Sequence, residues 1–522
     1  PSQLRLRDVW AEVLGVVPGL DDDFFALGGD SLLAIRVIAD AEAAGIEIAL
    51  ADLFATPTIR ALAPDGTGTH PPAGQSERPA GRSEDVDLAR RFGPDVEAVY
   101  PATLMQLGLL FEAEADPDSG LYIDVISRRI EGRFDAALFT EALRLTLKRH
   151  PALRTGFDLH TLDMPGQLVY SEPAISLEIT DVRGESPETA AAAVQEDLRA
   201  AALPFAPDDR SLIRFRVTRT TGMEYSLTYG FHHAVMDGWS ESVFAAELLR
   251  RYDAQLSGAA PEPTWPSQGY ADFVALEQQS LQSEATRQYW KERCAALAPT
   301  LTSSGEGRPG SDRRTLVAAV PQDVVQGLRH GSRQWRLPYK SLVVAGHLAA
   351  LGRHFGTAEP VTGLIVNGRP ETAESDQLVG LFLNVVPVSA LVTGSWKKMA
   401  GSVFEEEKAL LPHRRFPYPA LRELMGTQLF DVAFNYVQFH RSAQLLELKE
   451  TRVVDTRIED KTSFPLAFDV VQSPDGEQLT IEAAAAADTF SATDLDAVVA
   501  AHLDVYQEMA ADAVTGGVGR HV

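Results

Sequence analysis

The sequence predicts a small all-α unit followed by a larger α/β unit that is made of two lobes. Apolar residues recur at helical spacing in residues 1–63, whereas strand-like and helix-like segments alternate from residue 97 onward. The chain has 522 residues, which exceeds one ordinary hydrophobic core. The second part is itself too long for one usual core, so we expect lobes at residues 97–265 and 266–515.

The first unit is expected to be helical throughout. A first amphipathic helix precedes Pro18, a second begins at Ser31 and ends near Gly45, and a short third follows Pro57. The apolar positions that predict the first helix are Leu4, Val9, Trp10, Val13 and Leu14, and those of the third are Ile59 and Leu62.

Residues 64–96 predict a flexible linker. They are rich in Pro, Gly, Ser and charged residues and contain little that could form a core. A linker of this length allows the helical unit to move relative to the rest of the chain.

The second part shows both kinds of periodicity. Residues 214–217 and 224–229 alternate as half-buried strands do, and residues 341–355 and 494–509 are apolar helix candidates. This mixture predicts an α/β fold.

Composition excludes several function classes. The chain carries 73 acidic and 47 basic residues, for a net charge of −26, which argues against binding to nucleic acid or an anionic membrane. No stretch approaches the ~20 apolar residues of a membrane span, and no signal-peptide pattern is present. The single cysteine, Cys294, fits a reducing cytoplasm and a buried apolar role, with no metal-like spacing around it. Because the sequence begins at Pro1, we expect a piece of a longer protein.

Ser31 follows a loop with two glycines, in the string Leu27-Gly28-Gly29-Asp30-Ser31-Leu32. Asp and Ser are both favoured at helix N-termini, so an ordinary helix cap explains the pattern. A modification site explains it as well, because the exposed hydroxyl would lie where helix amides and the helix dipole receive a phosphate. From the residues alone, the cap is favoured.

The pair His232-His233 follows a strand candidate, and Asp237-Gly238 come four and five residues later. If the strand continues through the pair, the two side chains point in opposite directions, so that one lines a cavity and the other is held in the packing. A shared metal site is poorly supported, because adjacent histidines are badly placed for it and no carboxylate spacing fits. A carboxylate after the pair can hold a loop by ion pairing, and the glycine lets the chain turn close to a ligand.

The residues from Asp22 to Ala34, DDFFALGGDSLLA, resemble the signature of peptidyl carrier proteins from nonribosomal peptide synthetases, and the likeness covers the whole first unit. It implies a four-helix carrier domain at residues 1–63. It also implies that Ser31 carries 4′-phosphopantetheine, whose thiol holds an aminoacyl or peptidyl thioester. A phosphopantetheinyl transferase and an upstream adenylation domain would then be partners. Asp30 is a variation, since many carriers have His at that position.

Residues 232–240, HHAVMDGWS, resemble the core motif of condensation domains, which are relatives of chloramphenicol acetyltransferase. Other stretches resemble further motifs of that family, in the family's order. They are residues 100–106, 149–157, 270–273, 366–370 and 379–384, with a weaker match at 434–436. The resemblance covers residues 97–515.

This second resemblance implies two acetyltransferase-like lobes in a V shape, with His233 in a tunnel where they meet. Arg369 would pair with Asp237. The implied reaction is aminolysis of the donor carrier's thioester by the amine of an acceptor carrier from the next module. His233 either takes a proton from that amine or positions it and stabilises the developing charge.

Other activities remain open at this point. Epimerisation domains share the histidine pair, but Trp239-Ser240 fits condensation better. A dual epimerising condensation domain would carry an extra His-rich motif, and residues 97–130 contain no His. Heterocyclisation domains replace the histidines with aspartates. A silent member that only recruits a partner enzyme would tend to lose one histidine of the pair, and both are present.

Overall fold

The computed structural model describes residues 2–25, 27, 29, 31–46, 48–63, 92–160, 164–259, 269–301, 313–372, 375–438, 448–473 and 476–515. Most of the predicted linker at residues 64–96 therefore lies outside the described residues, as do Gly28 and Asp30. Among the described residues, no helix is both long enough and apolar enough to cross a bilayer.

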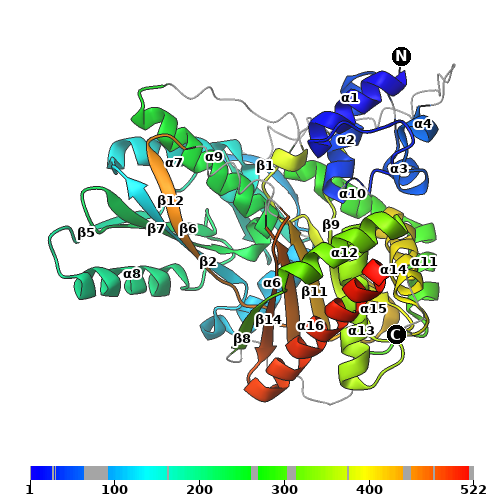
Figure 1. Ribbon diagram of the computed structural model, residues 1–522. Coiled ribbons are helices and arrows are strands. Elements are labelled where there is room, and N and C mark those ends of the chain that lie inside the picture. The colour runs from blue at the N-terminus through cyan, green and yellow to red at the C-terminus, as the bar shows by residue number, and fades with distance from the viewer. Residues whose placement is uncertain are drawn as a thin grey trace.

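The N-terminal unit is helical, as predicted. Its helices are α1 (Ser2–Leu14), α2 (Ser31–Ala43), α3 (Leu50–Ala55) and α4 (Ile59–Leu62) (Figure 1). The Trp10 and Phe24 rings lie 5.0 Å apart at the centre of its core. Leu4, expected on the inner face of α1, is 53% exposed, because the helix instead turns Leu6 inward. After α2 the chain turns at Gly45, whose φ of +75° lies in the left-handed region that favours glycine.

The first lobe of the larger unit is built on a five-stranded sheet in the order β12-β2-β7-β6-β5, with a three-stranded sheet, β1-β4-β3, beside it. Helices α7, α8 and α9 pack against the larger sheet (Figure 1). The bounds are β1 (Val96–Pro101), β2 (Ile123–Gly132), α7 (Ala136–Arg149), β3 (Thr155–Asp158), β4 (Gly166–Tyr170), β5 (Leu177–Asp181), α8 (Pro187–Ala201), β6 (Ile213–Arg219), β7 (Glu224–His232), α9 (Gly238–Leu256) and β12 (Thr451–Glu459).

Strand β7 is buried on both faces, so its prediction as half-buried was wrong. One face joins the lobe's hydrophobic core, as its apolar residues require. The other face lies against α8, where a Cβ added at Gly230 would come within 2.0 Å of the Ala201 carbonyl oxygen. Small and hydroxyl side chains on that face read as solvent-facing in the sequence, but they permit this close helix contact. Strand β6 alternates between buried and partly exposed residues, as expected.

The second lobe is built on a six-stranded sheet in the order β10-β9-β11-β13-β14-β8. Helix α13 contains the predicted helix at 341–355, and α16 contains the one at 494–509. Cys294 is buried in this lobe's core, as expected. The bounds are α10 (Tyr270–Gln282), α11 (Glu284–Cys294), β8 (Arg313–Ala319), α12 (Gln322–Trp335), α13 (Tyr339–Phe355), β9 (Val361–Asn367), β10 (Leu383–Ser389), α14 (Trp396–Leu410), α15 (Tyr418–Met425), β11 (Val432–Gln438), β13 (Leu466–Gln472), β14 (Leu479–Ala486) and α16 (Ala492–Thr515).

One strand crosses from the second lobe into the sheet of the first lobe. Strand β12 lies between β11 and β13 in the sequence, yet it pairs with β2 of the first lobe from Thr451 to Glu459. No single boundary near residue 265 therefore separates the two sheets. Helix α6 (Leu104–Ala115), early in the chain, likewise contacts α15 of the second lobe.

The helical unit rests on the second lobe, beside α14 (Figure 1). Phe25 and Phe54 pack against Phe404 of α14, with ring centroids 5.4 and 6.4 Å from that ring. Leu411, in the short helix η5 (Leu411–His413), belongs to the same hydrophobic cluster. We call these four residues the aromatic contact.

Candidate functional site

The histidine pair lies in a tight strand–turn–helix connection. Strand β7 ends at His232, the short helix η3 (His233–Val235) follows, and α9 begins at Gly238. Asp237 is the N-cap of α9, and its Oδ1 accepts a hydrogen bond from the Ser240 amide at 2.8 Å. The strand therefore does not continue through the pair. His232 is the last residue of β7, and His233 is the first residue of η3.

His232 is held inside the protein. It is 2% exposed, and its Nδ1 accepts a hydrogen bond from the Ala234 amide at 3.1 Å. Burial lowers the pKa of His232 to about 3, and the charge of His233 acts in the same direction. His232 is therefore neutral at physiological pH and shapes the turn.

His233 faces a cavity. Its amide donates to the Tyr122 carbonyl at 2.8 Å, and its Nδ1 lies 2.9 Å from Asp124 Oδ2. The side chain keeps 22% of its surface exposed. Burial alone would lower the pKa of His233, but the charge of Asp124 in the ion pair outweighs burial and raises that pKa to about 9. The imidazole is accordingly protonated at neutral pH.

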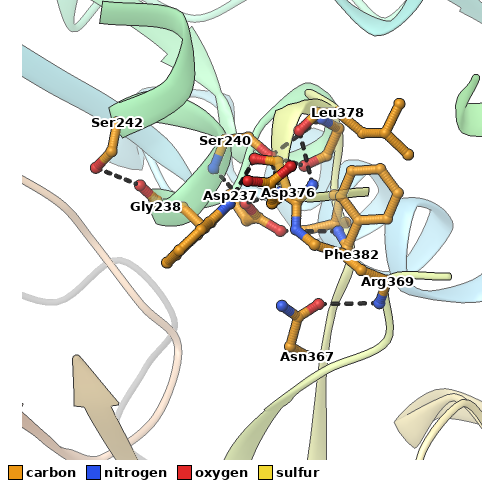
Figure 2. A network of polar contacts seen from close by, with 12 residues as sticks. Asp237, Gly238, Ser240, Ser242, Asn367, Arg369, Asp376, Leu378 and Phe382 are labelled. Carbon is orange, nitrogen blue, oxygen red and sulfur yellow. Dashed lines mark hydrogen bonds and ion pairs between the residues drawn. The ribbon is translucent and has the colours of Figure 1, made fainter. Parts of the chain in front are cut away.

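Asp237 joins the two lobes at the base of this turn (Figure 2). Its Oδ1 lies 3.3 Å from Arg369 Nη2, and its Oδ2 accepts from the Phe382 amide at 2.9 Å. The side chains of Arg369 and Asp237 are 1% and 7% exposed, so this ion pair is shielded from water. The guanidinium carbon of Arg369 also lies 4.1 Å from the centroid of the Phe382 ring.

Ser240 and Arg369 complete this network. Arg369 Nη2 donates to Ser240 Oγ at 2.6 Å, and Ser240 Oγ in turn donates to the Gly380 carbonyl at 2.8 Å. Arg369 Nη1 donates to the Ser375 and Leu378 carbonyls at 2.9 and 2.7 Å. The sequence motifs at 232–240, 366–370 and 379–384 thus meet at one place, although they are far apart in the chain.

Two further predicted motifs support the same turn. Gln106 of α6 donates through Nε2 to the Ala234 carbonyl at 3.0 Å, which ties residues 100–106 to η3. Tyr270 donates from its hydroxyl to the Leu381 carbonyl at 2.8 Å. The motif at 149–157 lies beside α9, where His150 Nε2 is 3.1 Å from Glu247 Oε2.

The cavity that His233 faces has a volume of about 1050 Å³. Residues of both lobes and of the helical unit line it, so it lies where all three parts of the chain meet. Its lining includes Phe54 from the helical unit, Tyr122, Asp124, His233 and Gly238 from the first lobe, and Val366, Asn435 and Asp469 from the second. A Cβ added at Gly238 would meet no atom of the described residues within 4 Å, so the space beside this glycine is open.

Three further acidic residues line the cavity. Asp460 follows β12, Asp469 lies on β13, and Glu482 lies on β14. Burial raises the pKa of Asp469 to about 7, and the charge of Asp460 adds to the effect. Burial and the charge of Asp124 likewise raise the pKa of Asp460. These two carboxyl groups therefore hold their protons more readily than exposed carboxyl groups do.

Ser31 is the first residue of α2, as the glycine loop predicted. The loop is tight before it, because the Gly29 amide donates to the Phe24 carbonyl at 2.9 Å and a Cβ at Gly29 would come within 2.4 Å of the Phe24 ring. Glycine at that position follows from this close approach.

Sequence reasoning missed Asp124, Tyr122 and Asp460. None belongs to a motif that we singled out, and each comes from a segment remote from the histidines in the chain. The available signal was an acidic residue at the start of an otherwise apolar strand, in LYIDVI. Tyr122 is also one of two described non-glycine residues with positive φ, at +60°.

Two family profiles match the chain. The profile described as Condensation domain matches residues 96–515, and the profile described as Phosphopantetheine attachment site matches residues 4–63. Ser31 lies within the range of the attachment-site profile, and Arg369 lies within the range of the condensation-domain profile.

Known proteins give the same picture. The AMB antimetabolite synthetase AmbE of Pseudomonas aeruginosa is 32% identical over 535 residues, which cover 98% of this chain and 25% of that protein. The phosphinothricin tripeptide synthetase PhsB of Streptomyces viridochromogenes is 29% identical over 401 residues, which cover 75% of this chain and 33% of that protein. The chain thus spans about a third or less of the length of these relatives.

Solved structures share the fold of the larger unit. The condensation domain from Monacolin K polyketide synthase MokA matches with a TM-score of 0.68 and 17% identity, covering 80% of this chain and 99% of that chain. The first condensation domain of the CDA synthetase matches with a TM-score of 0.66 and 23% identity, covering 80% of this chain and 97% of that chain.

Proposed function

Because the chain belongs to the condensation-domain family and carries a phosphopantetheine attachment domain ahead of that domain, we propose that it forms peptide bonds in nonribosomal peptide synthesis. The observation that carries the proposal is the place of His233. It lies on the wall of a cavity shared by both lobes and by the helical unit, and the chain's motifs converge behind it. We assign residues 1–63 as the carrier domain and residues 97–515 as the condensation domain.

The carrier would hold 4′-phosphopantetheine on Ser31, and this group supplies a thiol that carries an acyl chain as a thioester. The cavity is large enough for a sizeable substrate, since about 1050 Å³ is at the upper end of small-molecule sites. Phe54 of the carrier lies on the cavity wall, so this domain contacts the cavity that its own substrate would enter. We therefore propose that this carrier is the donor.

His233 would act at the thioester carbonyl. An α-amino group titrates near 8, so a usable fraction of the acceptor amine is neutral at cellular pH without a strong base. The amine first adds to the carbonyl carbon and forms the C–N bond, and the tetrahedral intermediate then collapses with cleavage of the C–S bond. The proton lost by the amine ends on the released thiol. Because His233 carries a proton, it stabilises the negative charge that develops on the carbonyl oxygen. Holding both reactants in one cavity supplies much of the remaining rate.

The proposed partners follow from this scheme. They are an acceptor carrier domain from the next module, an upstream adenylation domain that loads Ser31, and a phosphopantetheinyl transferase that modifies it. We place the protein in the cytoplasm, where these partners and the reduced thiol are found.

The test is a transfer assay on the whole chain. Synthetic aminoacyl coenzyme A thioesters and a phosphopantetheinyl transferase load Ser31, and a separately loaded aminoacyl carrier is added as acceptor. Intact-protein mass spectrometry then follows the acceptor, which gains the mass of the donor acyl group if condensation occurs. A panel of small and large aminoacyl groups is needed because the donor side chain is unspecified.

Two variants make the result specific. Ser31→Ala removes the attachment point and should abolish loading, whereas His233→Ala should load normally and transfer at least a hundredfold more slowly, on the order of one removed electrostatic donor. Tight binding of the acceptor with no transfer across the panel would instead indicate a recruiting domain. Normal transfer by His233→Ala would reject the role of this histidine.

A further inference from the structure

We propose that Asp124 is a positioning residue that holds the His233 imidazole through Nδ1 and keeps it as a hydrogen-bond donor to the reacting carbonyl oxygen. The inference rests on the proposed function and assigns a role to a residue outside every motif of the chain. It also chooses between the two roles that the sequence leaves open for His233, namely proton acceptor and charged donor.

The backbone places the two side chains together. Asp124 lies on β2, directly opposite Phe231 in the antiparallel pairing with β7, and His233 follows that residue by two positions. The His233 amide is fixed to the Tyr122 carbonyl at 2.8 Å, so both ends of the contact are anchored in the same pair of strands. The distance of 2.9 Å between Nδ1 and Asp124 Oδ2 is that of a close ion pair, although Nδ1 does not meet the geometry of a hydrogen bond.

The contact also fixes which ring nitrogen serves the cavity. Nδ1 of His233 is buried, whereas 22% of the side chain remains exposed and the residue lines the cavity. A nitrogen next to a carboxylate carries a proton, because two acceptors do not pair. The other nitrogen, Nε2, is therefore left for the substrate.

Tyr122 braces this arrangement from the other side. Its hydroxyl donates to Glu112 of α6 at 2.5 Å and lies 2.7 Å from Ser463 Oγ, in the connection from β12 to β13. A non-glycine residue at φ +60° is uncommon and persists where its surroundings hold it in place. The carbonyl that anchors the His233 amide is thus itself fixed by both lobes.

The other charges around His233 favour the imidazolium. Asp124 faces it from β2, Asp237 from the N-cap of α9, and Asp460 from the end of β12. His232 would oppose a positive charge if it were protonated, but burial keeps it neutral. Asp237 is paired with Arg369, and burial raises the pKa of Asp460, so the main negative charge at the imidazole is that of Asp124, which is in direct contact with it at 2.9 Å. A charged donor is the state that this surrounding supports.

The primary test needs no substrate. Histidine ring nitrogens are labelled with ¹⁵N in the whole chain, and His233→Gln identifies the His233 signals among the 12 histidines. We expect both ring nitrogens to be protonated at pH 7.5, with a titration midpoint near 9. Asp124→Asn keeps the shape and removes the charge, so the midpoint should fall by about one pH unit or more. Asp124→Glu should keep most of the shift.

The matched control is Asp181→Asn, which removes an equal charge from an exposed ion pair with Arg183 on the far edge of the sheet. It should leave the His233 midpoint unchanged. A wild-type midpoint at or below 6.5, or an unchanged midpoint in Asp124→Asn, would overturn the inference. Since the wild-type spectrum is informative by itself, a variant that fails to fold does not remove the test.

The transfer assay separates donor from base. With a charged donor, the rate falls as His233 loses its proton near pH 9, and Asp124→Asn moves that fall to lower pH. The acceptor amine also loses its proton near pH 8, so the variant decides: with a general base, Asp124→Asn would move a rise in rate, and not a fall, to lower pH, and the donor role would be refuted. A chain that shows the expected titration but transfers no acyl group would refute the proposed function and leave the positioning of His233 by Asp124 standing.

Discussion

Replacing Arg369 with leucine should strongly destabilise the contact between the two lobes. Arg369 donates to the Ser375 and Leu378 carbonyls and to Ser240 Oγ, and it pairs with Asp237 at 3.3 Å. Leucine is apolar and shorter, so it leaves the Asp237 carboxylate buried beside the Phe382 amide without its counter-charge. The substitution therefore removes one member of a shielded pair and leaves the other in place.

The magnitude follows from burial. Breaking a buried ion pair by removing one partner costs about 3 to 5 kcal/mol, because the remaining charge is no longer compensated. The side chains of Arg369 and Asp237 are 1% and 7% exposed, so solvent screens this pair very little. Two carbonyls also lose a donor, at about 1 kcal/mol each, which places the expected loss at the upper end of that range.

Hydrogen exchange measured by mass spectrometry is the suitable assay, since a chain of several domains need not unfold in one step. Faster exchange is expected at the amides of Gly380 and Phe382, which donate to Ser240 Oγ and Asp237. The matched control is Arg353→Leu, which breaks a half-exposed ion pair to Glu508 and should cost less than about 1 kcal/mol. If both variants exchanged alike at these amides, the argument from burial would be refuted.

Three further outcomes are expected. Phe404→Asp places a charge in the aromatic contact and should slow transfer from the tethered carrier severalfold. The circular dichroism spectrum should show that the condensation domain keeps its fold. Equal transfer rates in the variant and the wild type would show that the contact does not affect transfer. Gly238→Val should leave the free energy of unfolding within about 1 kcal/mol of wild type in a urea titration, because a Cβ added at this glycine meets no atom of the described residues within 4 Å. The same side chain should reduce the rate of transfer, because it fills part of the cavity. Burial raises the pKa of Glu277 to about 7, so the folded state holds this proton more tightly than the unfolded state does. In urea titrations, the free energy of unfolding of the wild type should therefore fall between pH 5 and pH 8, by up to about 3 kcal/mol relative to Glu277→Gln. Parallel pH profiles of the two proteins would refute this reasoning.

The sequence identified the fold class and the motifs because each rests on local patterns. Helical spacing in α1 and α2 and the glycine loop before Ser31 are read directly from neighbouring residues. The single misplaced side chain of α1, Leu4, differs because helix rotation is set by packing against the rest of the unit. The half-buried expectation for β7 failed for the same reason, since only the tertiary contact with α8 reveals why that strand carries Gly230 and hydroxyl residues.

The sequence predicted the motifs of the candidate site but not how their side chains are arranged in space. The expectation that Arg369 lies beside Asp237 came from the family resemblance, and spacing alone could not have supplied it. Asp124 was missed because its importance arises from strand register, which places it near His233 across the β2–β7 pairing. The raised pKa of His233 could not be predicted from the sequence for the same reason, because it depends on charges contributed by separate elements.

The strand that crosses between the lobes ties the geometry of the candidate site to the relative position of the lobes. Residues 460–465 join β12, anchored in the first lobe, to β13, anchored in the second, and they line the cavity throughout. Within them, Lys461 Nζ donates to the Ser119 carbonyl of the first lobe at 2.7 Å, while Arg313 of the second lobe donates to the Thr462 carbonyl at 3.0 Å. Because this segment is held by both lobes, the position of the Asp460 carboxylate relative to His233 depends on how the two lobes are placed. The backbone between β12 and β13 is thus a direct covalent link between the two lobes at the cavity wall.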